Sequence, residues 1–384
     1  MLRFRGDPEE GSTGGRLGVI AASSALESLR TEVPGAPDSA LTVAPASPEE
    51  VAKVLRHATQ NGLTVQVLGG GTHSGYGSPS VPDIVLSTRG LVGVESWEPD
   101  DLTMVVAAGA RVADIEAMLA EKSQTAVMPE RPGDSTLGGV ISTGRSAWRR
   151  SRLYSTRERI LEVTLVTGDG RLVRAGGRVV KNVTGYDLPR LVVGAFGSLG
   201  VVTSVCLKLW PVPPSAVTVA IGTLPAATGV ARPLAVLEDR RGIRVFLWGT
   251  SAEVEALAGR LGGEASQGHD WPADPSGPFR WSLRVPPALV AQAIERLPDH
   301  WDYVASHGVG EVRAASSDSD GAGRIRDWAE RNEGALVVVD APQEARDGLD
   351  PWGTPPPALG VQRRLISHFD PGRVINPGRL PGGL

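Results

Sequence analysis

Residues 68–77 read LGGGTHSGYG and follow directly on Thr64–Leu68, a short run that is typical of a β-strand. Consecutive glycines after a strand let backbone N–H groups close around an anionic diphosphate, because no Cβ atoms stand in the way. The pattern is not G-x-G-x-x-G, since the sixth position from Gly69 is Ser74, and a Walker lysine is missing. We predict a phosphate cradle of neither the Rossmann nor the P-loop kind. A plain glycine-rich turn is the alternative reading of this segment alone.

Two further stretches downstream have the same character. Residues 132–144 (PGDSTLGGVISTG) are almost all small or polar, which suits a planar, polar cofactor lying against the backbone. Within the glycine-dense stretch 129–144 we expect an irregular loop, and long irregular loops tend to be functional. The third stretch combines KNVTGYDL at 181–188 with GAFGSLGVVT at 194–203, just before a strand. We therefore expect several small-residue segments around one cofactor.

The order of these segments resembles the FAD-binding domain of the vanillyl-alcohol-oxidase (PCMH-type) superfamily. KNVTGYDL and the closing FDPGRVINPGR at 369–379 resemble the glycolate oxidase FAD-binding subunits in particular. The resemblance extends over about Ala44–Pro213 and the C-terminus, and it is weak between them. It implies that the first glycine loop binds the FAD pyrophosphate, the second runs along the cofactor, and the late strand contacts it. The implied FAD-binding residues are Gly69, Gly70, Gly71, Thr72, His73, Ser74, Gly133, Ser135, Thr136, Gly138, Gly139, Ser142, Thr143, Gly200 and Val202.

The mode of FAD attachment depends on His73. Some oxidases of this superfamily carry the flavin covalently through a His-Ser pair at a comparable place, and His73-Ser74 is such a pair. A histidine there can equally donate an N–H to the pyrophosphate. We expect a noncovalent FAD, because the resemblance to the glycolate oxidase subunits covers far more of the chain.

The predicted fold class is α+β: a PCMH-type FAD-binding domain made of two α/β subdomains, followed by a smaller α+β cap. Ser47, Pro48 and Glu50 predict a capped helix that runs to about Asn61. Prolines at 211, 213 and 214 predict the boundary with the cap. The expected domains are an uninformative N-terminal extension (1–43), the FAD domain (44–213), the cap (214–364) and a C-terminal segment that returns to the FAD domain (365–384).

The composition of the chain limits which partners and which cellular location we expect. The 384 residues suggest two domains, and a net charge of −4 without a Lys/Arg run paired with exposed aromatic residues argues against nucleic acid. The single cysteine, Cys206, lies among alternating apolar residues, so we expect it in the core, and alone it cannot ligate an iron–sulfur cluster. Residues 1–16 lack the apolar run of a signal peptide, and no stretch is long enough to span a bilayer. We expect a cytoplasmic protein, with peripheral membrane association only through partners.

Several polar residues receive modest roles. Lys181 and Asp187 are expected to pair or, for Asp187, to cap a helix, rather than to contact substrate. Asn376 is expected to set the turn before Pro377, with flavin contact as the alternative. We predict no metal site, since the cap histidines lack paired spacing and are read as surface residues. These histidines are His269, His300, His307 and His368.

The resemblance implies oxidation of glycolate, a small 2-hydroxy acid, to glyoxylate within a complex. The implied partners are a related, larger FAD subunit and an iron–sulfur subunit that receives the electrons. No residue is assigned as the catalytic base. The alternatives are a free-standing FAD oxidoreductase of another small alcohol or hydroxy acid, and a non-catalytic FAD-containing relay subunit.

Overall fold

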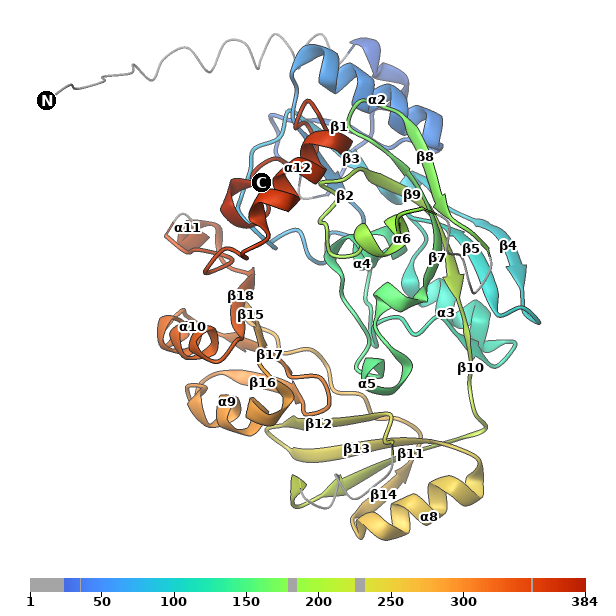
Figure 1. Ribbon diagram of the computed structural model, residues 1–384, viewed down its shortest axis with the longest axis vertical. Coiled ribbons are helices and arrows are strands. Elements are labelled where there is room, and N and C mark those ends of the chain that lie inside the picture. The colour runs from blue at the N-terminus through green and yellow to red at the C-terminus, as the bar shows by residue number, and fades with distance from the viewer. Residues whose placement is uncertain (1–23, 35, 179–184, 225–231, 347) are drawn as a thin grey trace, which may run out of the picture.

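The computed structural model describes residues 24–34, 36–178, 185–224, 232–346 and 348–384. The first four residues of the KNVTGYDL motif, including Lys181, lie outside this set, and so does the expected pairing of Lys181. Two small sheets form the upper part of the molecule in Figure 1, and one large sheet forms the lower part. Within the described residues, no helix is long and apolar enough to cross a membrane.

The first sheet is small and parallel, in the order β1 (Leu41–Val43), β3 (Ile84–Ser87) and β2 (Val65–Leu68). Helix α2 (Pro48–Asn61) precedes β2 as the sequence predicts. The Ser47 hydroxyl accepts from the Glu50 N–H at 3.2 Å, and Gly62 ends the helix in the left-handed conformation. Strand β2 therefore delivers the chain into the first glycine loop at Gly69.

The second sheet is antiparallel and holds the late strand. Its order is β4 (Val94–Glu98), β5 (Thr103–Ala107), β9 (Val201–Lys208), β7 (Ile160–Val166) and β8 (Leu172–Gly176). The predicted hairpin across Gly168–Gly170 is present as β7 and β8. Cys206 lies in β9 and is 1% exposed, which confirms its place in the core. Strands β6 (Gln124–Thr125) and β10 (Trp210–Pro211) pair in a separate two-stranded sheet.

The cap is built on one eight-stranded antiparallel sheet. Its order is β14 (Glu264–Gln267), β11 (Ser215–Ile221), β13 (Gly242–Gly249), β12 (Ala235–Asp239), β16 (Asp302–Ser306), β17 (Glu311–Ser316), β15 (Phe279–Arg284) and β18 (Ala335–Asp340). Helices α8, α9 and α10 pack on this sheet and lie on its outer side in Figure 1. The other face of the sheet packs against the FAD domain.

Most helices other than α2 are short. Their bounds are α3 (Val112–Ala120), α4 (Leu137–Thr143), α5 (Arg150–Leu153), α6 (Leu188–Leu191), α8 (Ser251–Leu261), α9 (Val290–Arg296), α10 (Ala322–Arg331), α11 (Gln343–Arg346) and α12 (Leu359–Phe369). Helix α4 corrects the expectation of an irregular loop throughout 129–144. Its glycines are poor helix formers, but Thr136 caps its first turn and Val140 and Ile141 anchor it in the core. Packing outweighs propensity here.

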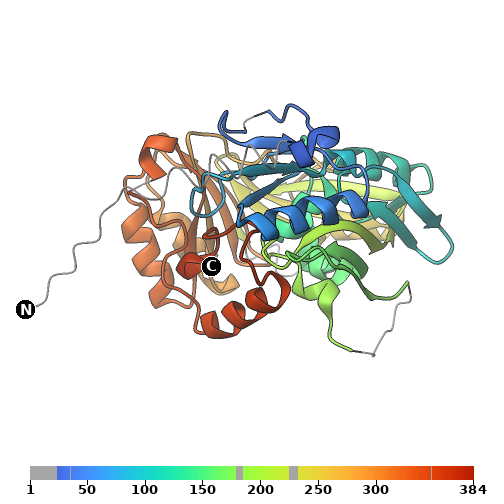
Figure 2. The ribbon, with the colours of Figure 1, turned by 90° about the horizontal axis from the view of Figure 1, so that it is seen from above.

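Both ends of the described chain pack against the first sheet. Leu26, Leu29, Leu41 and Val43 belong to its hydrophobic core, so this part of the N-terminal segment is structural. The C-terminal segment returns to the same sheet, where the Val65 N–H donates to the Val374 carbonyl at 2.7 Å. Figure 2 shows this red segment beside the blue N-terminal elements.

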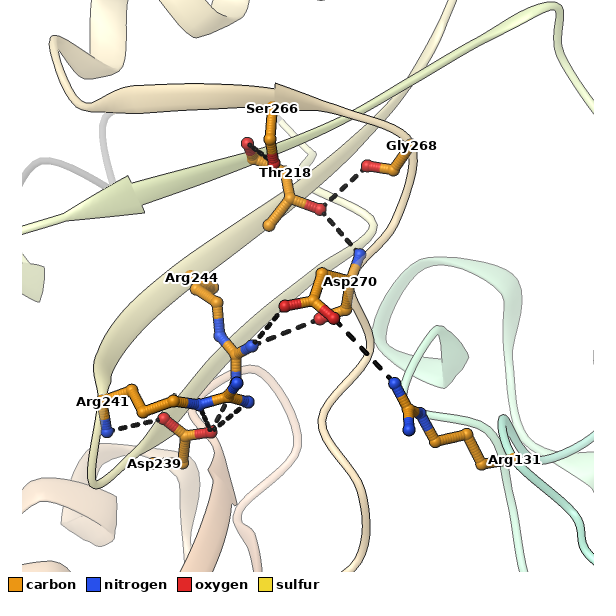
Figure 3. A network of polar contacts seen from close by, with 8 residues as sticks. All are labelled: Arg131, Thr218, Asp239, Arg241, Arg244, Ser266, Gly268 and Asp270. Carbon is orange, nitrogen blue, oxygen red and sulfur yellow. Dashed lines mark hydrogen bonds and ion pairs between the residues drawn. The ribbon is translucent and has the colours of Figure 1, made fainter.

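An apolar cluster joins the cap to the FAD domain. Trp148, 1% exposed, packs with Ala147 and Leu153 from the FAD domain and with Leu237 and Phe246 from the cap. Ion pairs lie beside this cluster. Asp270 pairs with Arg244 of the cap at 3.2 Å and with Arg131 of the FAD domain at 3.9 Å (Figure 3). The exposed Arg131 pair contributes little to stability, whereas the apolar cluster removes large side chains from water and stabilises the contact between the two parts.

Replacing Trp148 with alanine is therefore expected to lower the free energy of unfolding by about 3–5 kcal/mol, because it leaves a large cavity between the two parts. Chemical denaturation followed by circular dichroism measures this. Tyr154→Ala is the control, since Tyr154 is 60% exposed and should cost far less. Equal losses for the two variants would show that the cluster does not hold the cap.

Candidate functional site

A slot between the two small sheets collects most of the predicted residues. Its wall contains all of the predicted FAD-binding residues except Gly133 and Ser135. Ser135 stands directly behind the wall, with its hydroxyl 3.0 Å from that of Thr72. The additional wall residues are Val67, Leu68, Thr88, Phe196, Gly197, Val201, Asn376 and Arg379.

The glycines of the slot serve two different purposes. A Cβ atom at Gly70 would lie 1.8 Å from the Asp134 carbonyl oxygen, so glycine is needed for the two loops to approach each other. At Gly139 the nearest atom to such a Cβ is the Thr136 hydroxyl at 3.2 Å, with nothing else within 4 Å. A side chain at Gly139 would therefore project into the slot. An extended, planar ligand with anionic groups fits such a wall of backbone and hydroxyls.

The C-terminal segment fixes the first glycine loop. Asn376 adopts a positive φ of 47° and sets the expected turn, and its side chain also accepts from the Val67 N–H at 3.1 Å and donates to the Phe196 carbonyl at 2.8 Å. Arg379 donates to the carbonyls of His73 and Ser74, both at 3.1 Å. Burial lowers the pKa of Arg379 to about 10. These two side chains tie three segments of the slot into one unit.

His73 is held at both ring nitrogens. Arg145 donates to Nε2 at 2.8 Å, so Nε2 carries the lone pair, and Nδ1–H donates to the Thr72 hydroxyl at 2.9 Å. Burial, reinforced by the charges of Arg145 and Arg280, lowers the pKa of His73 from 6.5 to about 3. His73 is therefore neutral and bridges the glycine loop to Arg145.

This geometry bears on flavin attachment. Covalent attachment to a flavin methyl group would require one of these two hydrogen bonds of His73 to break, and we expect a noncovalent FAD. Acid precipitation of the purified protein should leave the yellow colour in the supernatant, in wild type and in any residual flavin of His73→Ala alike. Colour that stays in the wild-type pellet but leaves it in His73→Ala would contradict this.

A second pocket opens from the slot at His73 and Thr143, which line both. Four arginines from distant parts of the chain line it: Arg145, Arg280, Arg284 and Arg313. Strand β15 supplies two of them, because residues 280, 282 and 284 share one face and the opposite face is buried in the cap core. Arg313 on β17 stands opposite Ser282 and stacks on Trp148 with its guanidinium carbon 3.6 Å from the ring centroid.

The carboxylates of this pocket are both engaged. Asp274 binds Arg145 through one oxygen and Arg313 through the other, at 2.9 Å. Glu311 forms ion pairs with Arg313 at 3.1 Å and with Arg150 at 2.9 Å. Burial would raise the pKa of Glu311, but Arg313, Arg150 and Arg284 outweigh it and lower the pKa to about 2. Neither group is a free base, and among the described residues Arg284 makes no ion pair.

The cap histidines do not line this pocket. The prediction that they are surface residues is wrong for two of them. The His307 side chain is 8% exposed and its Nε2 lies 2.7 Å from a Glu238 oxygen. His269 is half-buried with Nε2 2.8 Å from the Leu247 carbonyl, and burial lowers its pKa. Asp187 caps α6, as expected, by accepting from the Arg190 N–H at 3.1 Å. In the described ranges no group of three or more His, Cys, Asp or Glu could hold a metal ion.

Comparison with known proteins identifies the family. Residues 39–176 match the FAD binding domain family. Glycolate oxidase subunit GlcE of Escherichia coli K12 is 31% identical over 341 residues, which cover 83% of this chain and 93% of GlcE. The chain belongs to the GlcE family of FAD-binding proteins. FAD is thus the cofactor of its first domain, and the predicted fold class is confirmed.

Other relatives share part of the chain or only the fold. A D-lactate dehydrogenase of Archaeoglobus fulgidus is 32% identical over 181 residues, which cover 46% of this chain but only 40% of that enzyme. Among solved structures, a chitooligosaccharide oxidase superposes with a TM-score of 0.65 at 13% identity, over 94% of this chain and 97% of that one. The latter likeness shows the shared fold alone.

Proposed function

We propose that this chain is the FAD-binding subunit of a glycolate-oxidase-type complex and takes part in oxidising a small 2-hydroxy acid, such as glycolate, to the 2-oxo acid. The observation that carries the proposal is the shared wall at His73 and Thr143, where the slot opens into a pocket of four arginines and two carboxylates. Surplus guanidinium groups beside a flavin slot suit a substrate with a carboxylate.

The proposed cofactor contacts are the predicted slot residues, with Asn376 and Arg379 holding the first glycine loop in place. When bound, FAD supplies the acceptor for a hydride from the Cα–H of the hydroxy acid. Arg284 would hold the substrate carboxylate, because among the described residues it makes no ion pair, whereas Arg280 on the same face of β15 is paired with Asp340 at 2.6 Å. The pocket walls would keep the hydroxyl carbon near Thr143.

Partners are part of this proposal. The hydroxyl proton needs a base, yet Asp274 and Glu311 are each bound by two arginines and His73 is bound at both nitrogens. We therefore propose that efficient turnover needs a related, larger FAD subunit, and that an iron–sulfur subunit receives the electrons. The buried Cys206 cannot serve as a cluster ligand. A cytoplasmic location, or a peripheral one through these partners, belongs to the same proposal.

The isolated, FAD-loaded chain is expected to be reduced by glycolate at least about tenfold more slowly than the assembled complex, since general-base catalysis contributes about 10²-fold or more. Anaerobic stopped-flow absorbance of the flavin, with and without copurified partners, measures both rates. Equal fast rates would contradict the need for partners. Flavin reduction in the complex, with no reduction of the isolated chain by any 2-hydroxy acid, would favour the second candidate, a relay subunit that keeps FAD without oxidising substrate.

A further inference from the structure

A large groove adjoins the arginine pocket and has a different character. Its apolar lining includes Leu191, Val193, Val337 and Leu365, which come from the FAD domain, the cap and helix α12. Three aromatic rings form one side, with centroids 5.1 Å apart for Tyr76 and Phe196 and 5.3 Å apart for Phe196 and Trp352. The ionisable lining residues in the described chain are Arg150, Arg157, Arg284 and Tyr76, with no carboxylate.

Thr143 lines the FAD slot, the arginine pocket and the groove alike. The Thr143 hydroxyl donates to the Gly139 carbonyl at 2.8 Å, which fixes it at the end of α4. Tyr76 and Arg284 separate the arginine pocket from the groove, since each lines both. A ligand whose carboxylate is bound at Arg284 therefore has the slot on one side and the groove on another.

The two cavities differ in size as well as polarity. The arginine pocket has a volume of about 60 Å³, and the groove about 510 Å³. Glycolate has only a hydrogen in place of a side chain, so it would leave the groove to water. Burying apolar groups against such a lining is favourable, and the gain grows with the area removed from water.

We propose that this groove receives the substrate side chain, so that the site favours 2-hydroxy acids with a large apolar side chain over glycolate. This inference rests on the proposed function. The carboxylate lies among the arginines, the hydroxyl carbon lies near Thr143, and the alkyl or aryl group contacts Leu365, Val337 and the three aromatic rings.

Binding of 2-oxo acids to the oxidised, FAD-loaded chain tests this without turnover. Pyruvate and 2-oxooctanoate share the carboxylate and carbonyl and differ by five methylenes, each adding roughly fourfold in affinity when fully buried. We expect 2-oxooctanoate to bind at least about tenfold more tightly, as measured by perturbation of the flavin absorbance. In Leu365→Glu or Val337→Glu this preference should fall to about twofold or less, with FAD content unchanged.

Leu172→Glu is the matched control, because Leu172 is 52% exposed on β8 and should keep the full preference. Equal affinities for the two acids in wild type would overturn the inference and leave the proposed function standing. Failure of both acids to bind would overturn the proposed function as well. A preference for 2-oxooctanoate that vanishes when the partner subunits are added would assign the groove to a protein interface. This outcome would also overturn the inference.

Discussion

Gly139→Val is expected to give a folded chain that is purified without FAD. The new side chain meets little protein, since only the Thr136 hydroxyl lies within 4 Å of the Cβ position, so it fills the slot where the cofactor must lie. A branched side chain that a ligand must displace costs about 1–3 kcal/mol, which corresponds to about 5- to 150-fold in affinity. The flavin absorbance per chain, together with a thermal unfolding curve, measures both properties.

Gly70→Val should lose FAD for a different reason. Its Cβ would overlap the Asp134 carbonyl oxygen, so the two loops must separate and the thermal midpoint should fall too. Gly259→Val in α8 is the control, because nothing lies within 4 Å of that Cβ and the residue is far from the slot. Full flavin loading of both slot variants would show that these loops do not bind the cofactor.

Arg284→Leu is expected to weaken binding of pyruvate to the FAD-loaded chain by about tenfold or more, with FAD content unchanged. A hydrogen bond to a charged group contributes about 1.5–3 kcal/mol, and the exposure of Arg284 places the effect at the lower end of that range. Flavin difference spectra measure the affinity. Arg324→Leu, on the exposed side of α10, is the control. Unchanged affinity in Arg284→Leu would exclude it as the carboxylate-binding residue.

The sequence was sufficient for the parts of the site that depend on local backbone. Consecutive glycines after a strand predicted the first loop, and the structure brings it together with the second loop and the start of β9. The helix inside the second loop could not be predicted, because Gly138 and Gly139 are poor helix formers and its stability comes from core packing. Tertiary contacts decide such short elements.

The arginine pocket could not be predicted from local patterns, because its members lie at positions 145, 280, 284 and 313. One signal was present in β15, where Arg280, Ser282 and Arg284 alternate with Phe279, Trp281 and Leu283. Such alternation ordinarily indicates a solvent-facing side. Only the packing of the cap sheet against Trp148 and α5 turns that face toward the flavin slot.

The flavin content of the purified chain tests the central claim most directly. The absorbance spectrum before acid precipitation, and chromatography of the supernatant after it, identify and count the cofactor. We predict one FAD per chain, released intact by acid. A colourless chain that cannot be reconstituted with FAD would contradict the assignment of the slot and the function built on it.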